Sequence, residues 1–419
     1  MIDAEDIKEL IDTSDRLVAS VSTDFHRYLS SEIDWNGRLI CIKGASGTGK
    51  TTLMRQRLKE SFGVGGKGVY VSLDDLWFST HGIRDAIVYF ESHGYTHVFI
   101  DEVHHFGKDW SLLIKNVYDQ FPRMSFVYSG SSLLKIEEGQ GDLARRQGSY
   151  GLKGLSFREF LAFEGVLDVP PLTLEEILGN HRKIAQDIVA SVRVLPLFEK
   201  YLECGYYPFY KEPGGLYQQR LRAIVSKVLE SDWPAVEDVS VETVRKAKKM
   251  LMILASSVPQ SPNMSRLYQQ LETERNTGLK ILGALDRGAL LALVPPKGEN
   301  LKNLSKPEKI YCDNTNMMHA LTPRANRGTA RETFFYNQVR KDHAAVFSGV
   351  GDFLVDNTWH FEIGGAVFDV DTREDSRTLV FSAEPFDEMT DREAPAFVIP
   401  EGADVSLKGV LFSGGGSAI

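Results

Sequence analysis

The sequence has no long apolar run and few cysteines. No stretch approaches the roughly twenty consecutive apolar residues that a membrane-spanning helix needs, and the first six residues, MIDAED, lack the basic and apolar regions of a signal peptide. Three scattered cysteines exclude a disulfide scaffold or a zinc site and are expected to be reduced, mostly buried thiols. We therefore expect a cytoplasmic protein with no membrane partner.

Positive charge and proline are also scarce. A net charge of -9 gives no general affinity for nucleic acid, so any such contact needs a local basic face. Only 16 prolines, 42% hydrophobic residues and 25% charged residues are typical of a folded chain. At 419 residues the chain is too long for a single hydrophobic core, so several domains are expected.

A glycine-rich loop follows the short apolar segment at residues 38–42. It matches Gly-x4-Gly-Lys-Thr in full, with Gly44, Ala45, Ser46, Gly47, Thr48, Gly49, Lys50, Thr51 and Thr52. This pattern predicts a buried strand, a loop whose backbone N–H groups wrap phosphates, and a helix whose N-terminus favours an anion. Met54, Leu58 and Phe62 recur at four-residue spacing, as expected for one face of that helix.

These features predict a site for Mg·ATP. Lys50 is expected to reach the β- and γ-phosphates, and Thr51 to bind magnesium through its hydroxyl. Residues 97–100 form a second apolar strand that ends in Asp101 and Glu102. Asp101 is expected to hold the metal, and Glu102 to act as the general base that activates the attacking water.

Two serines are candidates for sensing the γ-phosphate. Residues 68–74 and 124–128 are each typical of a parallel strand, and the second leads into Ser129 and Ser131. Either serine is a candidate sensor at the end of its strand, and the alternative is an ordinary serine-rich turn.

Two basic residues and two histidines have less specific patterns. Arg145 and Arg146 lie on the next helical stretch, where an arginine finger can reach the nucleotide of a neighbouring subunit. That role requires a homo-oligomer, and the alternative is a solvated basic face. His104 and His105 follow the acidic pair, and we interpret them as ordinary turn residues.

These motifs, with residues 129–132, 142–146 and 155–160, resemble a large prokaryotic family of AAA+-like ATPases. The segment Leu-Ser-Phe-Arg-Glu-Phe at 155–160 is the most specific marker. The resemblance implies an α/β fold with a parallel-sheet P-loop core, followed by a helical lid, a winged helix and a degenerate restriction-endonuclease-like domain. It also implies ATP hydrolysis with Mg2+ and adenine as the base, without fixing a cellular role.

The expected domain boundaries follow from this resemblance and from shifts in pattern along the chain. They are an N-terminal helical segment at 1–37, the P-loop core at 38–165, a helical lid at 166–235, the winged helix at 236–313 and the C-terminal domain at 314–419.

The winged helix is a candidate DNA-binding element. Residues 265–271 and 276–286 are typical of a helix pair, and strands at 290–294 and 309–312 flank a polar wing. The second helix and the basic run at 245–249 would supply donors to bases and phosphates. The donors on and beside the second helix are Arg275, Asn276, Lys280 and Arg287. The alternative is a winged helix that only packs and relays motion.

The C-terminal residues resemble a restriction-type nuclease site. Glu332 lies on a helix, and Asp352 and Glu362 lie where such a site has its carboxylates. Gly364 stands where the site needs a lysine. Without that cation we expect a domain kept for packing or recognition, and an ATP-driven nuclease is the alternative.

The expected function is ATP hydrolysis that changes the grip of the protein on a partner, with DNA among the candidate partners. The alternative is a slowly hydrolysing nucleotide switch that acts as a regulator or defence sensor. Glu102 favours hydrolysis, because a switch has no need of a general base.

Overall fold

The computed structural model describes residues 4–133, 143, 145–257, 262–298, 306–322, 325–363 and 377–381. The chain forms two compact units. Unit 1 contains Met1–Gly154 and Ser226–Ser240, and unit 2 contains Leu155–Val225 and Val241–Ile419. Unit 1 is therefore built from two separate stretches of the sequence. No helix within the described ranges is long and apolar enough to cross a membrane.

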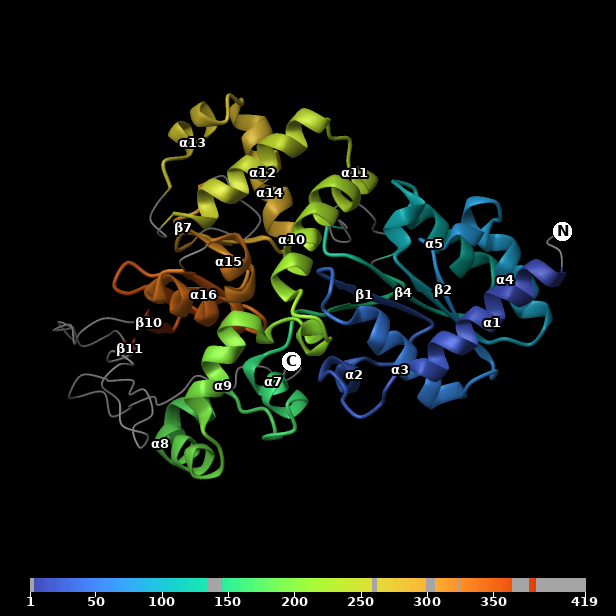
Figure 1. The fold of residues 1–419 in the computed structure, drawn as a ribbon, viewed down its shortest axis with the longest axis horizontal. Helices are drawn as coiled ribbons and strands as arrows, with labels where there is room; N and C mark the ends of the chain where they lie inside the picture. The colour runs from blue at the N-terminus through green and yellow to red at the C-terminus, as the bar shows by residue number, and fades with distance from the viewer. Residues whose placement is uncertain are drawn as a thin grey trace. The chain divides into compact units, whose positions relative to one another are not determined.

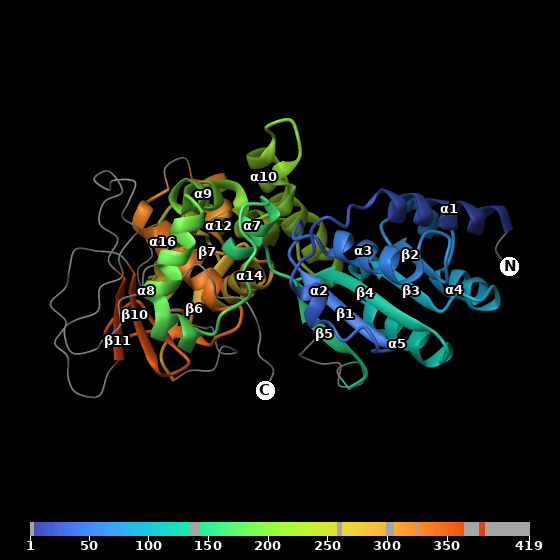
Figure 2. The same ribbon diagram turned by 90° about the horizontal axis from the view of Figure 1, so that it is seen from below.

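Unit 1 contains a five-stranded parallel sheet in the order β2-β3-β4-β1-β5 (Figures 1 and 2). The strands are β1 (Leu39–Gly44), β2 (Gly68–Ser72), β3 (His97–Asp101), β4 (Ser125–Ser131) and β5 (Gly148–Gly151). β4 lies between β1, which leads into the P-loop, and β3, which ends at the acidic pair. This inserted strand defines the additional-strand class, so the predicted fold class is confirmed.

Helices cover both faces of this sheet. The longer ones are α1 (Ala4–Ser20), α3 (Lys50–Phe62), α4 (Ile83–Ser92) and α5 (Trp110–Gln120), and the shorter ones are α2 (Leu29–Glu32), η1 (Leu76–Ser79) and η2 (Val103–Phe106). Successive strand residues alternate between two cores, as the pleat requires. Val71 packs with residues of α4 and α5, and Tyr70 packs with residues of α3. The stripe predicted for α3, which runs beside α1 (Figure 2), is buried at Met54 and Leu58.

The second stretch of unit 1 forms η5 (Val228–Asp232), a π-helix, and α11 (Trp233–Val236). Trp233 is completely buried, and Val236 packs against one of the two sheet cores. The helical lid predicted from the sequence extends to residue 235, whereas Ser226–Ser240 belongs to unit 1.

Unit 2 begins with helices. They are α7 (Phe157–Phe163), α8 (Leu174–Ser191), α9 (Val194–Lys200), η3 (Tyr201–Gly205), η4 (Pro208–Lys211) and α10 (Tyr217–Lys227), whose last two residues belong to unit 1. The marker segment at 155–160 starts α7 with a capping box, in which Ser156 and Glu159 bond each other's backbone N–H groups. Phe157 and Phe160 of the same segment are buried.

The helices and strands expected of a winged helix form in order. They are α12 (Val241–Ala255), α13 (Met264–Gln270), α14 (Arg275–Arg287) and the antiparallel pair β6 (Leu291–Val294) and β7 (Lys309–Cys312). Residues 299–305, half of the segment between the two strands, lie outside the described residues. That these elements act as a winged helix stays a prediction.

The C-terminal part of unit 2 contains α15 (Thr315–Leu321), α16 (Arg327–Val339) and a sheet of order β11-β10-β9-β8. Its strands are β8 (Ala345–Phe347), β9 (Phe353–Val355), β10 (Trp359–Ile363) and β11 (Arg377–Phe381). Residues of α8, β6, β7, α16, β9 and β10 share one hydrophobic core. The strand pair β6–β7 therefore packs with the C-terminal sheet. Gly364 and residues 382–419 lie outside the described residues.

Candidate active site

The P-loop connects β1 to α3. Gly47 and Gly49 have φ values of 84° and 97°, a left-handed conformation that favours glycine. Arg27 donates to the Thr48 carbonyl over 2.6 Å and so holds the loop from outside. The Lys50 ammonium is buried and donates to the carbonyls of Gly44 and Ala45 over 2.9 and 3.0 Å. The loop thus has the backbone shape that its sequence predicts.

The charge of Lys50 is set by its surroundings. Burial lowers the pKa of its ammonium, and the carboxylates of Glu102 and Asp101 act in the opposite direction. A buried cation needs such neighbours, because removing an ammonium from water without a counter-charge is unfavourable. The two acids predicted from the sequence therefore lie close enough to Lys50 to act on its charge.

Thr51 and Asp101 meet at the centre of the site. The Thr51 hydroxyl donates to Asp101 Oδ2 over 2.6 Å, although fifty residues separate them in the sequence. Asp101 is 1% exposed and also accepts hydrogen bonds from Tyr70, over 2.7 Å, and from Ser129. A hydroxyl and a carboxylate side by side are hard oxygen donors of the kind that Mg2+ prefers, so these residues fit a magnesium ion.

Tyr70 is a site residue that the sequence analysis missed. Burial and the charge of Asp101 raise the pKa of Tyr70, so its hydroxyl stays protonated and can donate to Asp101. Arg55 of α3 bonds the same hydroxyl over 3.0 Å and stacks over the ring. The only signal in the sequence is a tyrosine in an otherwise apolar strand.

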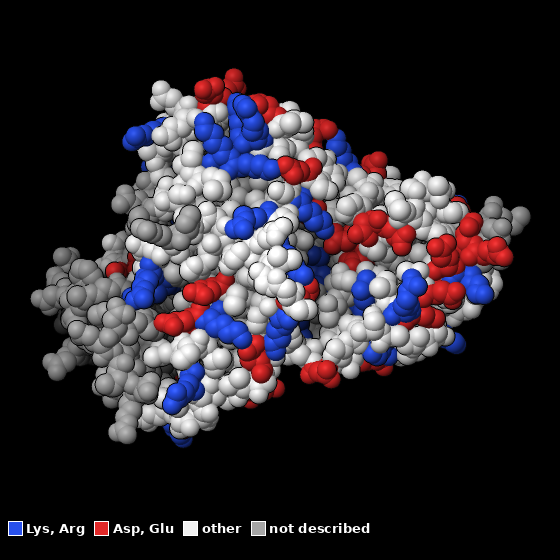
Figure 3. Space-filling view, in the orientation of Figure 1, with Lys and Arg blue, Asp and Glu red and all other residues white. Residues whose placement is uncertain are grey.

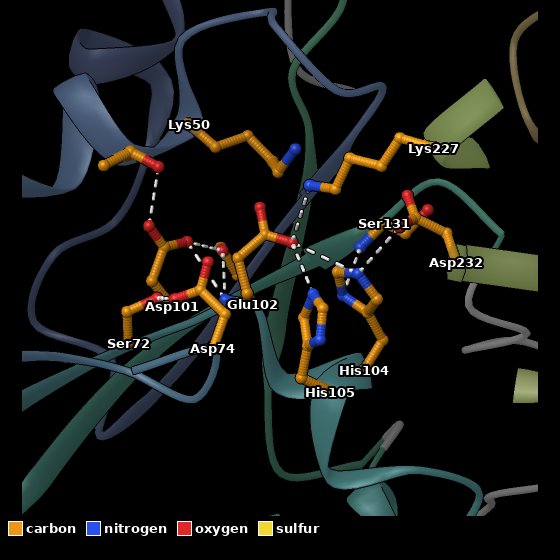
Figure 4. A network of polar contacts seen from close by, with 12 residues as sticks. Lys50, Ser72, Asp74, Asp101, Glu102, His104, His105, Ser131, Lys227 and Asp232 are labelled. Carbon is orange, nitrogen blue, oxygen red and sulfur yellow. Dashed lines mark hydrogen bonds and ion pairs between the residues drawn. The ribbon is translucent and has the colours of Figure 1, made fainter. Parts of the chain in front are cut away.

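Glu102 follows Asp101 in a left-handed conformation, with φ 55° and ψ 44°. Such a conformation costs a non-glycine residue about 1–2 kcal/mol, so the surrounding structure must enforce it. Its N–H donates to Asp101 Oδ1 and to Ser129 Oγ over 3.1 and 3.2 Å. Its carboxylate oxygen Oε2 lies 3.1 Å from His104 Nε2 and 3.7 Å from Lys227 Nζ (Figure 4).

Ser129 and Ser131 lie at the end of β4, next to the acidic pair. Ser129 bonds the carboxylate of Asp101 and the backbone of Glu102, and Ser131 donates its N–H to His104 Nδ1 over 3.4 Å. Both serines are buried. The interpretation of His104 as an ordinary turn residue is wrong, because the ring is completely buried beside the expected general base.

The two arginines differ in their surroundings. Arg146 pairs with Asp119 of α5 over 2.5 Å, and Arg145 is exposed. Residues 134–142 and 144, which precede them, lie outside the described residues. A finger role for either arginine, at the nucleotide of another copy, requires a neighbouring subunit.

A cavity of about 340 Å3 adjoins the acidic pair. Side chains of α1, α3, β2 and β3 line it, among them Thr51, Arg55, Tyr70, Asp74, Asp101 and Glu102. The expected metal ligands therefore face open space, although Asp101 itself is almost fully buried.

In unit 2 a lysine does lie beside the C-terminal carboxylates, but it comes from β7 and not from position 364. Lys309 Nζ of β7 lies 2.6 Å from Asp352 Oδ1 and 3.0 Å from Glu332 Oε2. Burial alone would lower the pKa of Lys309, but these two acids raise it. Burial and Asp352 raise the pKa of Glu362 to about 7. The expectation of carboxylates without a cation, based on Gly364, is therefore wrong.

The basic residues of α12 and α14 divide into two groups. Lys246 and Lys249 donate to the carbonyls of Glu272 and Gln270 and so stabilise the end of α13. Arg275, Asn276 and Lys280 of α14 are exposed, and Arg287 is partly buried. Lys and Arg side chains gather over α12 and α14, and Asp and Glu side chains gather near α1 (Figure 3). A local basic face exists on this acidic chain.

Known proteins resemble separate parts of the chain. An AAA domain family matches residues 36–161, and a domain of unknown function (DUF8612) matches residues 195–328. An uncharacterized protein of Methanocaldococcus jannaschii is 30% identical over 288 residues, which are 65% of this chain and 60% of that protein. The chain thus spans less than two thirds of this relative.

Solved structures give weaker likenesses. RuvB of Thermotoga maritima is 17% identical, with a TM-score of 0.28 over 70% of this chain and 90% of RuvB. AMPPCP-bound DnaA from Aquifex aeolicus is 14% identical, with a TM-score of 0.26 over 68% of this chain and 88% of DnaA. These TM-scores are too low to transfer any feature to this chain. Residues 36–161 are therefore similar to an AAA domain, and they carry the additional-strand sheet and the P-loop joined to the acidic pair.

Proposed function

We propose that the chain binds Mg·ATP at residues 44–52 and hydrolyses it with Glu102 as general base. The observation that carries this proposal is the contact of Thr51 with Asp101, which brings the two expected magnesium ligands together one residue before Glu102. A pure binding protein would need the P-loop and the metal ligands but no carboxylate in this place.

Each residue then has a defined task. The backbone N–H groups of the loop bind phosphate oxygens, and Lys50 exchanges its bonds to loop carbonyls for bonds to the β- and γ-phosphates. Magnesium, held by Thr51 and Asp101, would supply positive charge to the phosphate oxygens. Glu102 accepts a proton from water, whose oxygen bonds the γ-phosphorus as the bond to the bridging oxygen breaks. The products are ADP and inorganic phosphate.

The test compares wild-type protein with Lys50→Ala and Glu102→Gln in steady-state turnover and in binding of a fluorescent ATP analogue. We expect Glu102→Gln to bind nucleotide with unchanged affinity while kcat falls by about 100- to 10,000-fold. Lys50→Ala should lose both binding and turnover. If the wild type binds ATP but turns over no faster than Glu102→Gln, the nucleotide-switch alternative replaces this proposal.

Three finer roles accompany the proposal. Ser129 orients Asp101 and is the better candidate sensor, because it contacts both acids. Arg145 is the better candidate finger, because Arg146 is engaged by Asp119. Exposed Arg275, Asn276 and Lys280 make DNA the first partner to try, so turnover should be measured with and without duplex DNA.

A second candidate function is magnesium-dependent cleavage of phosphodiesters in unit 2. The position of Lys309 favours it, since a lysine among carboxylates can stabilise the charge that develops during hydrolysis. Wild-type protein should then nick supercoiled DNA with Mg2+, and Lys309→Met or Glu362→Gln should abolish nicking. Lys306→Met, at an exposed position three residues away, is the control and should leave nicking unchanged.

An ion pair that only neutralises buried acids predicts a different result. In that case the wild type does not cleave, or Lys309→Met cleaves as fast as the wild type, and Lys309→Met chiefly lowers the melting temperature.

A further inference from the structure

His104 lies between two carboxylates. Its Nε2 is 3.1 Å from Glu102 Oε2 and 3.5 Å from Asp232 Oδ1 (Figure 4). His104 and Asp232 are 0% and 2% exposed, so bulk water does not provide hydrogen-bond partners for either side chain. Among the described residues neither contact is a well-aligned hydrogen bond. Catalytic hydrogen bonds are often long or misaligned before the substrate binds.

The other ring nitrogen fixes the position of the proton. His104 Nδ1 accepts a hydrogen bond from the N–H of Ser131, so in the neutral ring the proton is on Nε2. A protonated Nε2 can donate to a carboxylate but has no lone pair for a metal ion. The group of Glu102, His104 and His105, whose ligand atoms lie within 4.8 Å of one another, is therefore suited to hydrogen bonding rather than to metal binding.

This contact determines which oxygen of Glu102 is available for catalysis. Oε2 faces His104 and Lys227, and the other oxygen projects toward Lys50 in Figure 4. The backbone of Glu102 is already fixed by its bonds to Asp101 and Ser129. With both backbone and Oε2 held, one oxygen is left to accept the proton of the attacking water.

Asp232 orients the ring from a distant part of the sequence. It belongs to η5, in the stretch Ser226–Ser240 that returns to unit 1. Burial raises the pKa of Asp232, but the neighbouring His104 and the charge of Lys227 lower it by more, so the carboxylate is ionised. The completely buried Trp233 follows directly and anchors this stretch.

We propose that His104 and Asp232 are positioning residues for hydrolysis: Asp232 orients the His104 ring, and His104 holds Glu102 in place for the attacking water. The proposal rests on hydrolysis by Glu102 as proposed above. It makes turnover, but not nucleotide binding, depend on residues 226–240.

Two amide substitutions separate the contributions of the two ring nitrogens. His104→Asn keeps an acceptor for Ser131 and removes the donor to Glu102, whereas His104→Gln can place an N–H near the position of Nε2. We expect kcat to fall by about 10- to 100-fold in His104→Asn, with KM and ATP affinity unchanged, and to recover in large part in His104→Gln. Asp232→Ala should resemble His104→Asn. His93→Asn, at an exposed position at the end of α4, is the control and should change kcat less than twofold.

The outcomes distinguish this proposal from the proposed function. If Glu102→Gln abolishes turnover but His104→Asn keeps wild-type kcat, the positioning role is wrong and hydrolysis by Glu102 stands. A parallel loss of ATP affinity and thermal stability in both His104 variants would also overturn it, since it would indicate a merely structural role.

A second readout does not depend on turnover. Nitrogen NMR of full-length protein labelled with 15N-histidine reports the tautomer of His104, identified as the signal absent from His104→Asn. We expect the proton on Nε2. A proton on Nδ1 would overturn the positioning role even if the protein hydrolyses no ATP.

Discussion

At the scale of single residues, the structure joins groups that the sequence keeps far apart. Thr51 reaches Asp101, Tyr70 supports the same carboxylate, and Lys309 reaches Asp352. The first contact could be predicted because the P-loop and the acidic strand follow a known order. The other two could not, because a tyrosine or lysine within a short strand carries no signal of what it faces.

Glu362 leads to a prediction about pH. Its pKa in the folded protein is raised to about 7 from 4.5. The folded state therefore retains a proton that the unfolded chain releases, and this contribution to stability is full below about pH 4.5 and is lost as pH rises through 7. With EDTA present, the melting temperature of Glu362→Gln should rise relative to that of the wild type as the pH is raised from 5 to 8. The exposed Glu199→Gln is the control and should show no such trend.

A constant difference between Glu362→Gln and wild type across this pH range would contradict the raised pKa. The comparison uses the difference between variants, so titrating groups distant from Glu362 cancel to first order.

At the scale of elements, most helices and strands could be predicted from the sequence. The predicted helices at 265–271 and 276–286 agree with α13 and α14 within a residue or two. The capping box of Ser156 and Glu159 also explains part of the marker segment, because it fixes the start of α7. Packing partners were harder to predict, since the sequence did not indicate that β6 and β7 share a core with β9 and β10.

Two glycines of α14 give a matched pair of substitutions. A Cβ at Gly278 would lie 2.4 Å from the Tyr268 ring of α13, whereas a Cβ at Gly283 would meet only the tip of Arg287 at 3.2 Å. Gly278→Ala should destabilise by about 1–3 kcal/mol through overpacking. Gly283→Ala should be neutral or stabilise by up to about 1 kcal/mol, because alanine favours the helix. Urea unfolding measures both.

Equal effects of the two alanines would mean that α13 and α14 can move apart to admit the methyl group at little cost in the free energy of unfolding. The close packing of Tyr268 against Gly278 requires Gly278→Ala to be clearly less stable than Gly283→Ala.

At the scale of the whole molecule, the sequence predicted a P-loop core at 38–165 followed by further segments. Residues 155–165 belong to unit 2, and unit 1 contains residues 38–154 of that core. The sequence did not reveal that Ser226–Ser240 returns to the same unit. Its residues are a π-helix and a short helix around a buried tryptophan, and such short apolar stretches fit many packing sites equally well. Only the folded chain shows that they pack beside the acidic pair.

Because Ser226–Ser240 follows part of unit 2 in the sequence, the residues of unit 1 are not all synthesised together. During synthesis the P-loop, the acids and His104 leave the ribosome first, then the first part of unit 2, and only afterwards Asp232 and Trp233. A nascent chain therefore has every residue needed to hold ATP well before it has the residue that orients the ring of His104. Newly made protein would therefore hydrolyse nucleotide slowly until the chain has grown past residue 240, so translation itself would delay full turnover.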